Sequence, residues 1–327
     1  MIAWRRPVLA VAVAAVLALT SCGTERRLDA ISVGVPALEQ NALLYVAQDR
    51  GYFSRRGVAV TLKDFDAGPP AVAALMSGTV DVAETAEFPF VVSSMGGQRM
   101  RILAANDRFE NDYLVARRAR GISRVSDLNG KRIGVTMGAI TEFYLSRFLT
   151  LHGIRRDSVT LVNVAARDFA SSIEDNRVDA VVAWQPFVHR MVDRAPNLFH
   201  VWPVQSGQAV YGILVCEQDW LDSNHGAVSS FLEGLADAEN LLGEHPAQAQ
   251  GIVARRLGYS GTYLASVWPL HRFSITLDFS LVAAMEDEAR WVADHHLASA
   301  GQDLDFGDLV YRDGLAGIRP EGVNLMP

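Results

Sequence analysis

Short apolar runs alternate with segments of helical periodicity along most of the chain from residue 31 onward. Residues 31–35 (ISVGV) predict a buried strand, and the apolar positions after Asn41 predict a helix that ends at Gly51. Further strands are expected at residues 58–62, 80–83, 101–105, 132–136, 160–164 and 180–184, and further helices at residues 69–78, 88–95, 139–152, 168–176 and 186–194. This alternation predicts an α/β fold in which helices cover parallel sheets.

Two extended segments, residues 112–118 and 209–216, enclose the middle of this pattern. If the chain leaves one lobe at the first and returns at the second, the fold has two doubly wound α/β lobes, two hinge strands and a ligand cleft between the lobes. Lobe 1 is expected to comprise residues 30–114 and 214–327, and lobe 2 residues 115–213. The C-terminal part is expected to be helical at residues 225–243, 246–257, 261–269 and 281–296, with one strand at residues 272–277.

The first 21 residues have the pattern of an export signal. Arg5 and Arg6 form a short basic region, and residues 7–19 are almost wholly apolar but too short to span a bilayer comfortably as a helix. The sequence Leu19-Thr20-Ser21-Cys22 resembles the lipobox of bacterial lipoproteins, which implies cleavage before Cys22 and lipid on its sulfur. We therefore expect an exported protein, lipid-anchored to the outer face of the bacterial cell membrane, with residues 22–29 as a tether. An ordinary secretory signal with an incidental Cys is the alternative.

Charge and cysteine content restrict the function classes. The chain has 30 basic and 37 acidic residues, and loss of Arg5 and Arg6 leaves 28 basic residues and a formal charge of −9. That balance argues against nucleic acid as a partner, because binding to phosphates needs clustered basic residues. Cys216, in the apolar run YGILVC, is expected to be a small buried hydrophobic residue, so a Cys-type metal site is excluded. We expect no metal and no cofactor.

The bend at residues 136–141 joins an expected strand to an expected helix. A helix start leaves backbone N–H groups unpaired at the positive end of the helix dipole. Gly138 permits a tight turn, Thr136 and Thr141 add hydroxyl donors, and the N–H groups of residues 139–141 can converge on one oxyanion. Glu142 is expected to cap the helix. The alternative is an ordinary strand-to-helix turn that binds no ligand.

Four short motifs, in order between residues 31 and 220, resemble those of periplasmic solute-binding proteins. They are Gly51-Tyr52-Phe53 with Gly57-Val58; Ala74-Leu75 with Gly78 and residues 80–83 (VDVA); residues 126–135 (SDLNGKRIGV); and residues 178–180 (VDA) with Trp184-Gln185-Pro186. The group that carries them serves ABC importers of nitrate, sulfonates, taurine and pyrimidine precursors of thiamine. The resemblance implies a type II periplasmic binding protein that closes on a small ligand and presents it to a membrane permease. We expect this protein to act as a monomer.

The resemblance also places the ligand in loops at the C-terminal ends of strands. Those loops are residues 36–41, 84–87, 106–112, 136–141 and 184–185. The ligand-binding residues predicted in them are Glu39, Gln40, Asn41, Thr85, Glu87, Asp107, Thr136, Gly138, Ala139, Ile140, Thr141, Trp184 and Gln185. Trp184 is expected to form an aromatic wall for the ligand, with a role in the core as the alternative. Ala86 stands where the family usually has Gly, which puts close approach of the ligand to the backbone there in doubt. Ala139 stands where the family usually has Ser, which removes one hydroxyl from the expected oxyanion pocket.

Acidic residues are frequent in these loops, namely Glu39, Glu84, Glu87, Asp107, Glu110 and Asp112. A carboxylate 4 Å from a bound anion repels it by about 4 kcal/mol at an effective dielectric constant near 20, whereas an amine on the ligand reverses the sign. We therefore hypothesise a small polar ligand with a cationic or hydrogen-bond-donating end, such as an aminosulfonate, an aminopyrimidine or another amine. The alternative is that most of these acids face solvent.

An enzyme is the second function class, because a relative of this family synthesises the thiamine pyrimidine on the same fold. The sequence has no GxSxG, HExxH or paired-Cys motif and no glycine-rich dinucleotide fingerprint. His295 and His296, as neighbours on an expected helix, point about 100° apart and make a poor metal pair. A ligand-sensing accessory module is the third class. The sequence as a whole favours a binding protein without catalytic residues.

Overall fold

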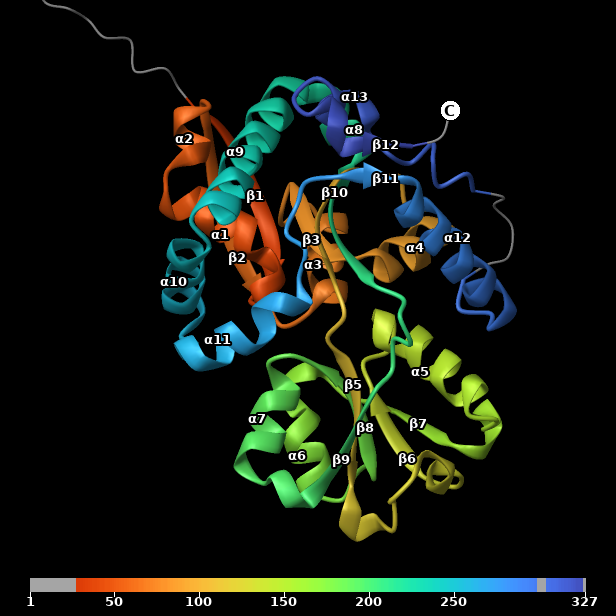
Figure 1. Ribbon diagram of the computed structural model, residues 1–327. Coiled ribbons are helices and arrows are strands. Elements are labelled where there is room, and N and C mark those ends of the chain that lie inside the picture. Colours follow the sequence, from red (N-terminus) through yellow and green to blue (C-terminus); the bar gives the residue numbers. More distant parts are fainter. Residues whose placement is uncertain (1–27, 299–303, 326–327) are drawn as a thin grey trace, which may run out of the picture.

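Two five-stranded sheets organise the chain, and each is covered by its own helices (Figure 1). The structure is a computed structural model that describes residues 28–298 and 304–325. The sheet of lobe 1 has the strand order β2-β1-β3-β10-β4, and the sheet of lobe 2 has the order β7-β6-β8-β5-β9. The expected arrangement of two α/β lobes is confirmed. The expected lipidation site, Cys22, and the export signal lie outside the described residues.

The strands and helices lie close to the ranges that the sequence predicts. Lobe 1 contains β1 (Asp29–Pro36), α1 (Ala42–Asp49), α2 (Tyr52–Arg55), β2 (Val58–Phe65), α3 (Gly68–Met76), β3 (Val82–Ala86), α4 (Glu87–Met95), β4 (Met100–Phe109) and β10 (Val210–Glu217). Lobe 2 contains β5 (Asp112–Arg117), β6 (Arg132–Val135), α5 (Ile140–Leu151), β7 (Thr160–Asn163), α6 (Phe169–Glu174), β8 (Ala180–Trp184), α7 (Phe187–Arg194) and β9 (Phe199–Pro203). The sequence pattern did not predict β9.

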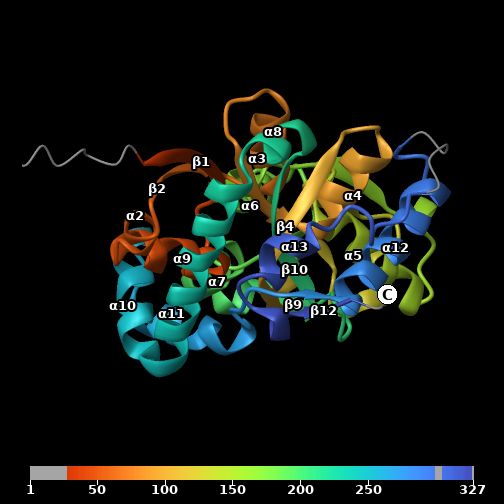
Figure 2. The same cartoon turned by 90° about the horizontal axis from the view of Figure 1, so that it is seen from above.

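The C-terminal part returns to lobe 1 and wraps around it (Figure 2). It contains α8 (Gln218–Ser223), α9 (His225–Glu244), α10 (Pro246–Leu257), α11 (Gly261–Val267), β11 (Leu277–Asp278), α12 (Phe279–Asp294), α13 (Arg312–Ala316) and β12 (Val323–Asn324). Single-turn 3-10 helices are η1 (Glu39–Asn41), η2 (Arg118–Arg120), η3 (Val125–Leu128), η4 (Arg156–Ser158), η5 (Ala166–Asp168), η6 (Pro196–Leu198), η7 (Trp268–Leu270) and η8 (Pro320–Gly322).

Both sheets are mixed, so the expectation of parallel sheets is wrong for the strands that connect the lobes. Strand β1 runs parallel to β2 and β3, but β10 runs antiparallel to β3 and β4. Likewise β6 is parallel to β7 and β8, whereas β5 is antiparallel to β8 and β9. A strand that arrives from the other lobe enters the sheet beside the C-terminal ends of its neighbours. It is therefore antiparallel to them.

The chain crosses between the lobes at residues 110–111 and 204–209. These crossings lie a few residues before the expected boundaries at 114 and 213, because Gly212 already pairs with Ala86 and Asp107 in the lobe 1 sheet. Gln205 joins the two crossings: its Oε1 accepts a hydrogen bond from the backbone N–H of Asp112 (2.8 Å), and its Nε2 donates to the carbonyl of Phe109 (3.1 Å). The two hinge segments are thus tied to each other by one buried amide.

The expected strand at residues 272–277 is mostly irregular. Only Leu277 and Asp278 form a strand, β11, which pairs with β12. The segment instead covers the edge of β4 through isolated bridges between His271 and Phe109 and between Thr276 and Ala105. Covering an edge in this way removes an exposed row of unpaired backbone groups.

Apolar side chains fill both lobes. In lobe 1 the rings of Phe53 and Phe231 stack 5.2 Å apart and join α2 to α9. Cys216 on β10 is fully buried, as predicted. Within the described residues, no helix combines the length and the hydrophobicity of a membrane-crossing segment.

Candidate functional site

A small cavity lies where the lobes meet, and residues of both lobes line it. Lobe 1 and the hinge contribute Pro36, Leu38, Gln40, Ala67, Gly68, Pro69, Ala86, Pro89, Phe109 and Asn111, and lobe 2 contributes Asp112, Ala139, Ile140 and Trp184. The cavity offers about 50 Å³ of free space. That volume is close to the room taken by one or two water molecules, at about 30 Å³ each. The lobes are therefore closed on each other, and any solute larger than this must enter while they are apart.

The N-terminus of α5 presents two free donors to this region. Ala139 is the residue before the helix, and Gly138 has the left-handed conformation (φ +74°) that glycine adopts without strain. The N–H of Gly138 donates to Glu142 Oε2 (2.9 Å), which confirms that Glu142 caps the helix. Within the described residues, the N–H groups of Ile140 and Thr141 have no acceptor. These two N–H groups lie at the positive end of the helix dipole and suit an anionic or hydrogen-bond-accepting group.

Trp184 and Asp112 form the wall of the cavity on the lobe 2 side. They lie opposite each other on the antiparallel strands β8 and β5. The indole ring of Trp184 is 8% exposed and meets Phe169 and Phe187 edge to face, with ring centres 5.4 and 5.7 Å apart. Trp184 is therefore both a core residue of lobe 2 and a wall of the cavity. Its Nε1 and the Oδ2 of Asp112 are buried without a hydrogen-bond partner, so one can donate to a ligand and the other can accept.

A buried polar network lies behind Gln40 on the lobe 1 side. The Nε2 of Gln40 donates to Glu84 Oε1 (2.9 Å), and the Nδ2 of Asn41 donates to Glu84 Oε2 (3.1 Å). Burial raises the pKa of Glu84 to about 7, although these two amides oppose the rise. Gly212 makes room for this carboxylate, since a Cβ there would lie 2.8 Å from Glu84 Oε1.

A second network joins two carboxylates to one histidine. The Nδ1 of His271 lies 2.5 Å from Asp107 Oδ2, and its Nε2 lies 3.9 Å from Glu39 Oε1. Burial alone would lower the pKa of His271, but the two carboxylates raise it overall, so the imidazolium form is favoured. Tyr263 on α11 donates to Glu39 Oε1 (3.0 Å). The acid nearest to this group is Glu84, whose charge interacts with Asp107.

The structure brings most of the predicted ligand-binding residues to the lobe junction. Gln40, Ala139, Ile140 and Trp184 line the cavity. Glu39, Asn41, Thr85, Glu87, Asp107 and Thr141 are buried behind the lining. Thr136, Gly138 and Gln185 are not among the lining residues, and each makes a local hydrogen bond: Thr136 donates to the carbonyl of Val164 (2.8 Å), Gly138 donates to Glu142, and Gln185 Oε1 accepts from the N–H of His189 (3.1 Å).

Sequence reasoning missed several residues of the site. Ala67, Gly68 and Pro69 line the cavity from the start of α3, which the sequence showed only as a helix opening. His271, Tyr263, Tyr144 and Glu288 come from distant parts of the chain, and their positions depend on the wrapping of the C-terminal helices. No local motif marks them, although a buried acid in an apolar helix face, as at Glu288 in α12, is a signal that could have been used.

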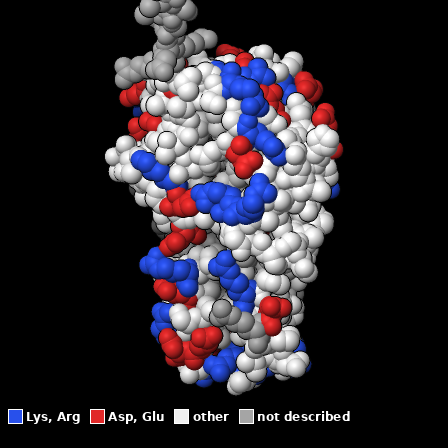
Figure 3. All heavy atoms as spheres, turned by 90° about the vertical axis from the view of Figure 1, so that its left-hand side faces the viewer, with Lys and Arg blue, Asp and Glu red and all other residues white. Residues whose placement is uncertain are grey.

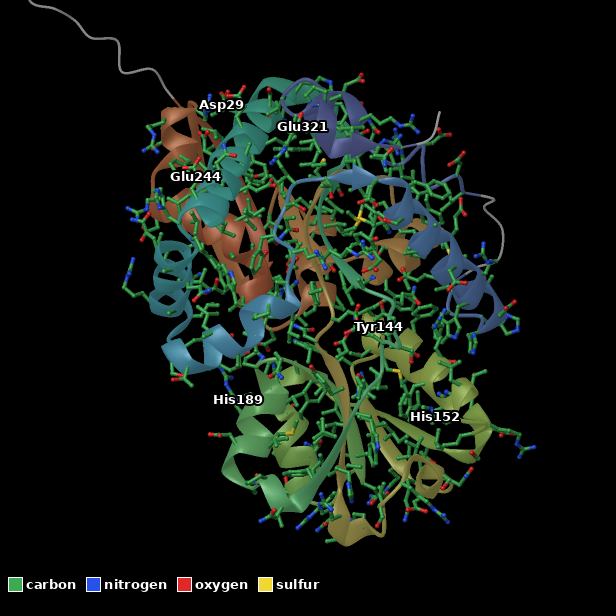
Figure 4. All side chains as sticks on the ribbon, viewed as in Figure 1. Asp29, Tyr144, His152, His189, Glu244 and Glu321 are labelled. Carbon is green, nitrogen blue, oxygen red and sulfur yellow. The ribbon has the colours of Figure 1, made fainter. Side chains whose placement is uncertain are left out.

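Two kinds of contact hold the lobes together. On the side of α5 and α12, the contact is largely apolar: the ring of Phe143 of lobe 2 packs against those of Phe88 and Trp291 of lobe 1, with ring centres 6.0 and 5.7 Å away, and the rings of Phe88 and Trp291 lie 5.6 Å apart. Trp291 Nε1 also donates to Ser146 Oγ (3.0 Å). On the side of α7 and α11, the rings of His189 and Tyr263 lie 4.8 Å apart. Figure 4 shows His189 and Tyr144 on these opposite sides of the lobe junction.

Charged side chains form a second closing contact. Arg167, just before α6 in lobe 2, pairs with Asp66 in the lobe 1 loop that leads to the cavity (2.5 Å). On the face seen in Figure 3, basic side chains lie beside acidic ones. Because exposed ion pairs exchange readily with water and buried apolar contacts do not, we expect the contact between Arg167 and Asp66 to break most readily as the lobes part.

Two mixed α/β lobes, joined by two strand crossings and closed on a cavity, define the type II periplasmic binding protein fold. The chain belongs to the NMT1/THI5-like family, whose match covers residues 39–249. A protein of Brucella abortus that is named as a binding protein is 23% identical over 218 residues, which are 65% of this chain and 66% of that protein. The taurine-binding periplasmic protein of Escherichia coli is 26% identical over 197 residues, or 59% of this chain and 61% of that protein. The chain thus spans less than two thirds of the length of either relative.

Solved structures agree on the fold. The periplasmic aliphatic sulphonate binding protein SsuA of Escherichia coli superposes with a TM-score of 0.72 at 16% identity, covering 87% of this chain and 98% of SsuA. At that identity the likeness describes the backbone arrangement and not the ligand.

Proposed function

We propose that this protein is the extracytoplasmic solute-binding component of an ABC importer, which captures a small polar solute between its lobes and presents the closed form to a membrane permease. The observation that carries the proposal is the cavity lined from both lobes, because a solute there is held only when the lobes close. The free energy of binding then shifts the protein toward the closed form that a permease recognises. The taurine and sulphonate relatives support a solute of similar size.

The solute has an accepting group at one end. The free N–H groups of Ile140 and Thr141 and the indole N–H of Trp184 are donors without acceptors near the cavity. A sulfonate or another oxygen-rich group satisfies all three. A buried donor left unpaired costs about 1–3 kcal/mol, so such a group is favoured over an apolar one.

The other end carries an amine or another hydrogen-bond donor, as in an aminosulfonate or an aminopyrimidine. The side chains of Asn111 and Asp112 each offer a buried oxygen without a partner, and no Lys, Arg or His is among the residues that line the cavity. Above the raised pKa of Asp112, about 7, a plain anion would meet its charge with no compensating cation among the lining residues, at about 4 kcal/mol for a 4 Å separation and a dielectric constant near 20. An ammonium group turns that repulsion into attraction.

The geometry gives an enzyme less support. His271 and Asp107 form a buried His–Asp pair, but the free Nε2 of His271 faces the carboxylate of Glu39 rather than a hydroxyl or thiol. A nucleophile activated by His needs that position. Within residues 28–298 and 304–325, no three His, Cys, Asp or Glu side chains are arranged to hold a metal ion. Anchoring through lipid on Cys22 and a sensing role in place of transport remain proposals that need their own tests.

Isothermal titration with taurine, nitrate, ethanesulfonate, an aminopyrimidine and putrescine tests the proposal, with small-angle scattering to detect lobe closure. We expect at least one amine-bearing compound to bind and to reduce the radius of gyration. Trp184→Phe replaces the indole with a smaller aromatic ring that lacks the N–H, and it should weaken binding at least about fivefold through the loss of one hydrogen bond. The matched control is Trp202→Phe on β9, outside the cavity lining. Binding of no compound would reject the solute-binding role, and tight binding of nitrate alone would reject the amine.

A further inference from the structure

A group of buried acids lies directly behind the cavity, where α4, α5, α12 and the start of β5 meet. Glu87 and Glu288 are fully buried, and Asp112 is 3% exposed. Glu87 Oε1, Asp112 Oδ2 and both carboxylate oxygens of Glu288 have no hydrogen-bond partner. Among the described residues, the N–H of Tyr211 donates to Glu87 Oε2 (3.1 Å), and the backbone N–H of Glu87 itself also favours the charged form of this carboxyl.

The hydroxyl of Tyr144 is the second unpartnered group here. It is fully buried on α5 of lobe 2 near the side chain of Gln205, and it forms no hydrogen bond of normal geometry among the described residues. Its pKa is raised by burial and then by the charges of Glu87, Glu288 and Asp112. A phenol O–H can donate to a carboxylate and accept from an ammonium. Figure 4 shows Tyr144 at the junction of the lobes.

No cation of the protein compensates these acids. Among the described residues, no Lys, Arg or His forms an ion pair with Glu87, Asp112 or Glu288. The other polar groups packed around them are neutral or already engaged: Gln205 bonds to the hinge backbone, Glu142 caps α5, and Asp287 pairs with Arg147 (2.9 Å). Burial raises the pKa of Asp112 to about 7, and burial together with mutual repulsion raises the pKa values of Glu87 and Glu288. Without a ligand, the cluster therefore holds protons near neutral pH.

The cluster is continuous with the cavity. Asp112 lines the cavity, and so do Ala86 and Pro89, which flank Glu87 in the chain. A charged group that enters at Asp112 thus comes close to Glu87, and through it to Glu288.

We propose that Glu87, Asp112 and Glu288, with the hydroxyl of Tyr144, form the subsite for the ammonium group of the solute, and that this group enters in exchange for protons held by the cluster. The inference rests on the proposed function, to which it adds the site of the amine and its regulation. The exchange balances: one positive charge enters the site as R–NH₃⁺, and up to one proton leaves to solvent. Because Glu87 and Glu288 belong to lobe 1 and Tyr144 to lobe 2, the ammonium bridges the lobes in the closed form. Acid then favours release of the solute, since protons compete for the same carboxylates.

Three pairs of compounds test the subsite: taurine and isethionate, ethylammonium and ethanol, and putrescine and 1,4-butanediol. Each pair differs by replacement of an amine with a hydroxyl. Titration at pH 7.5 in two buffers of different ionisation enthalpy gives both the affinity and the number of protons exchanged. We expect at least one amine to bind at least tenfold more tightly than its hydroxyl partner, with release of about one proton per amine group bound, since the exchange replaces one charge with another.

Variants show whether the cluster is responsible. Glu288→Gln and Tyr144→Phe should each weaken amine binding about tenfold, and Glu288→Gln should also reduce the proton release. Glu286→Gln, an exposed Glu on the same helix, should change neither. Circular dichroism and thermal unfolding verify that each variant is folded. Glu288→Gln and Tyr144→Phe conserve the shape of the side chain, so we expect both variants to fold. Either variant alone is sufficient for the test.

The following outcomes overturn the proposal. They are equal affinity for an amine and its hydroxyl partner, amine binding without proton release, unchanged binding in both variants, or binding of K⁺ or Ca²⁺ in place of any amine. If no amine binds but ethanesulfonate or nitrate does, the subsite is rejected while the solute-binding role stands. If nothing binds, both are rejected.

Discussion

Asp112 and Trp184 lie directly opposite each other on the antiparallel strands β5 and β8, at the edge of lobe 2 that faces lobe 1. One side chain holds a buried acceptor and the other a buried donor, and neither has a partner in the protein. Directly opposed residues on antiparallel strands have Cβ atoms about 5 Å apart. A ligand that bears a donor and an acceptor a few bonds apart therefore satisfies both residues at once, which a simple anion cannot do.

The buried acids should make the stability of the ligand-free protein fall as the pH rises from 5 to 7. The pKa values of Glu84 and Asp112 are raised by burial to about 7, well above the usual value of about 4 for an unfolded chain. Between these values the folded state binds more protons than the unfolded state, so the free energy of unfolding decreases with pH. Each of these carboxyls lowers the free energy of unfolding by at most about 1.4 kcal/mol for each pH unit of increase.

Urea unfolding at pH 5, 6, 7 and 8 measures this dependence. Asp112→Asn should reduce the slope between pH 5 and 7, because the amide does not titrate. Asp193→Asn, an exposed position on α7, should leave it unchanged. A stability that rises over this interval would contradict the assignment of these carboxyls as protonated in the folded state.

The ion pair between Arg167 and Asp66 should favour lobe closure slightly. Both side chains are more than half exposed, so water and salt screen the pair strongly. Arg167→Ala is expected to weaken solute binding about two- to fivefold without affecting the fold, because the open form becomes more populated. Titration at low and high salt checks this, and the difference from wild type should shrink at high salt.

A matched control for this pair is Arg155→Ala, which removes a similarly exposed pair with Asp157 (3.1 Å) that lies within lobe 2. Exchange of the two charges in Arg167→Asp with Asp66→Arg should restore most of the affinity. If Arg155→Ala has the same effect as Arg167→Ala, the role of the interlobe pair in closure is rejected.

Phe143→Ala should strongly destabilise the protein as a whole. Phe143 is 1% exposed and packs against both Phe88 and Trp291 of the other lobe, so its loss leaves a cavity in the apolar contact that joins the lobes. Substitutions of this type cost about 3–5 kcal/mol. Leu151→Ala, at a position of the same helix that is 61% exposed, should change the free energy of unfolding by less than about 0.5 kcal/mol. A small effect of Phe143→Ala on urea unfolding would show that the α5–α12 side also opens.

Gly212→Ala should disturb the network behind Gln40. A Cβ at this position would lie 2.8 Å from Glu84 Oε1 and 3.3 Å from Asn106 Oδ1, and Glu84 cannot move freely because Gln40 and Asn41 hold it. Overpacking of this kind costs about 1–3 kcal/mol. Gly226→Ala, on α9 with nothing near the added methyl, should instead stabilise the protein by about 0.4–1 kcal/mol. Equal effects of the two substitutions on the melting temperature would refute the role of Gly212.

The periodicity of the chain was sufficient to predict most strands and helices, since each element has a local pattern. It also marked two long extended segments without a following helix, and the domain boundaries placed at these segments remain a prediction. It was wrong on the direction of β5 and β10, since strand direction within a sheet depends on where the chain enters, and no local pattern carries that information. The short strand β9 was missed, and residues 272–277 were expected to form a longer strand than β11.

The sequence by itself determined the two-lobed α/β architecture and the loops that reach the lobe junction, because alternating hydrophobic periods and glycine positions are local properties. It also showed that these loops are rich in acids. Only the tertiary structure decided which of those acids are buried together with Glu288 of α12 and Tyr144 of α5. It also decided that Thr136 and Gln185 form local hydrogen bonds. The physical reason is that burial, and the pKa shifts and unpaired groups that follow from it, arise from contacts between segments far apart in the chain, and those contacts exist only once the C-terminal helices have wrapped around lobe 1 and the lobes have closed.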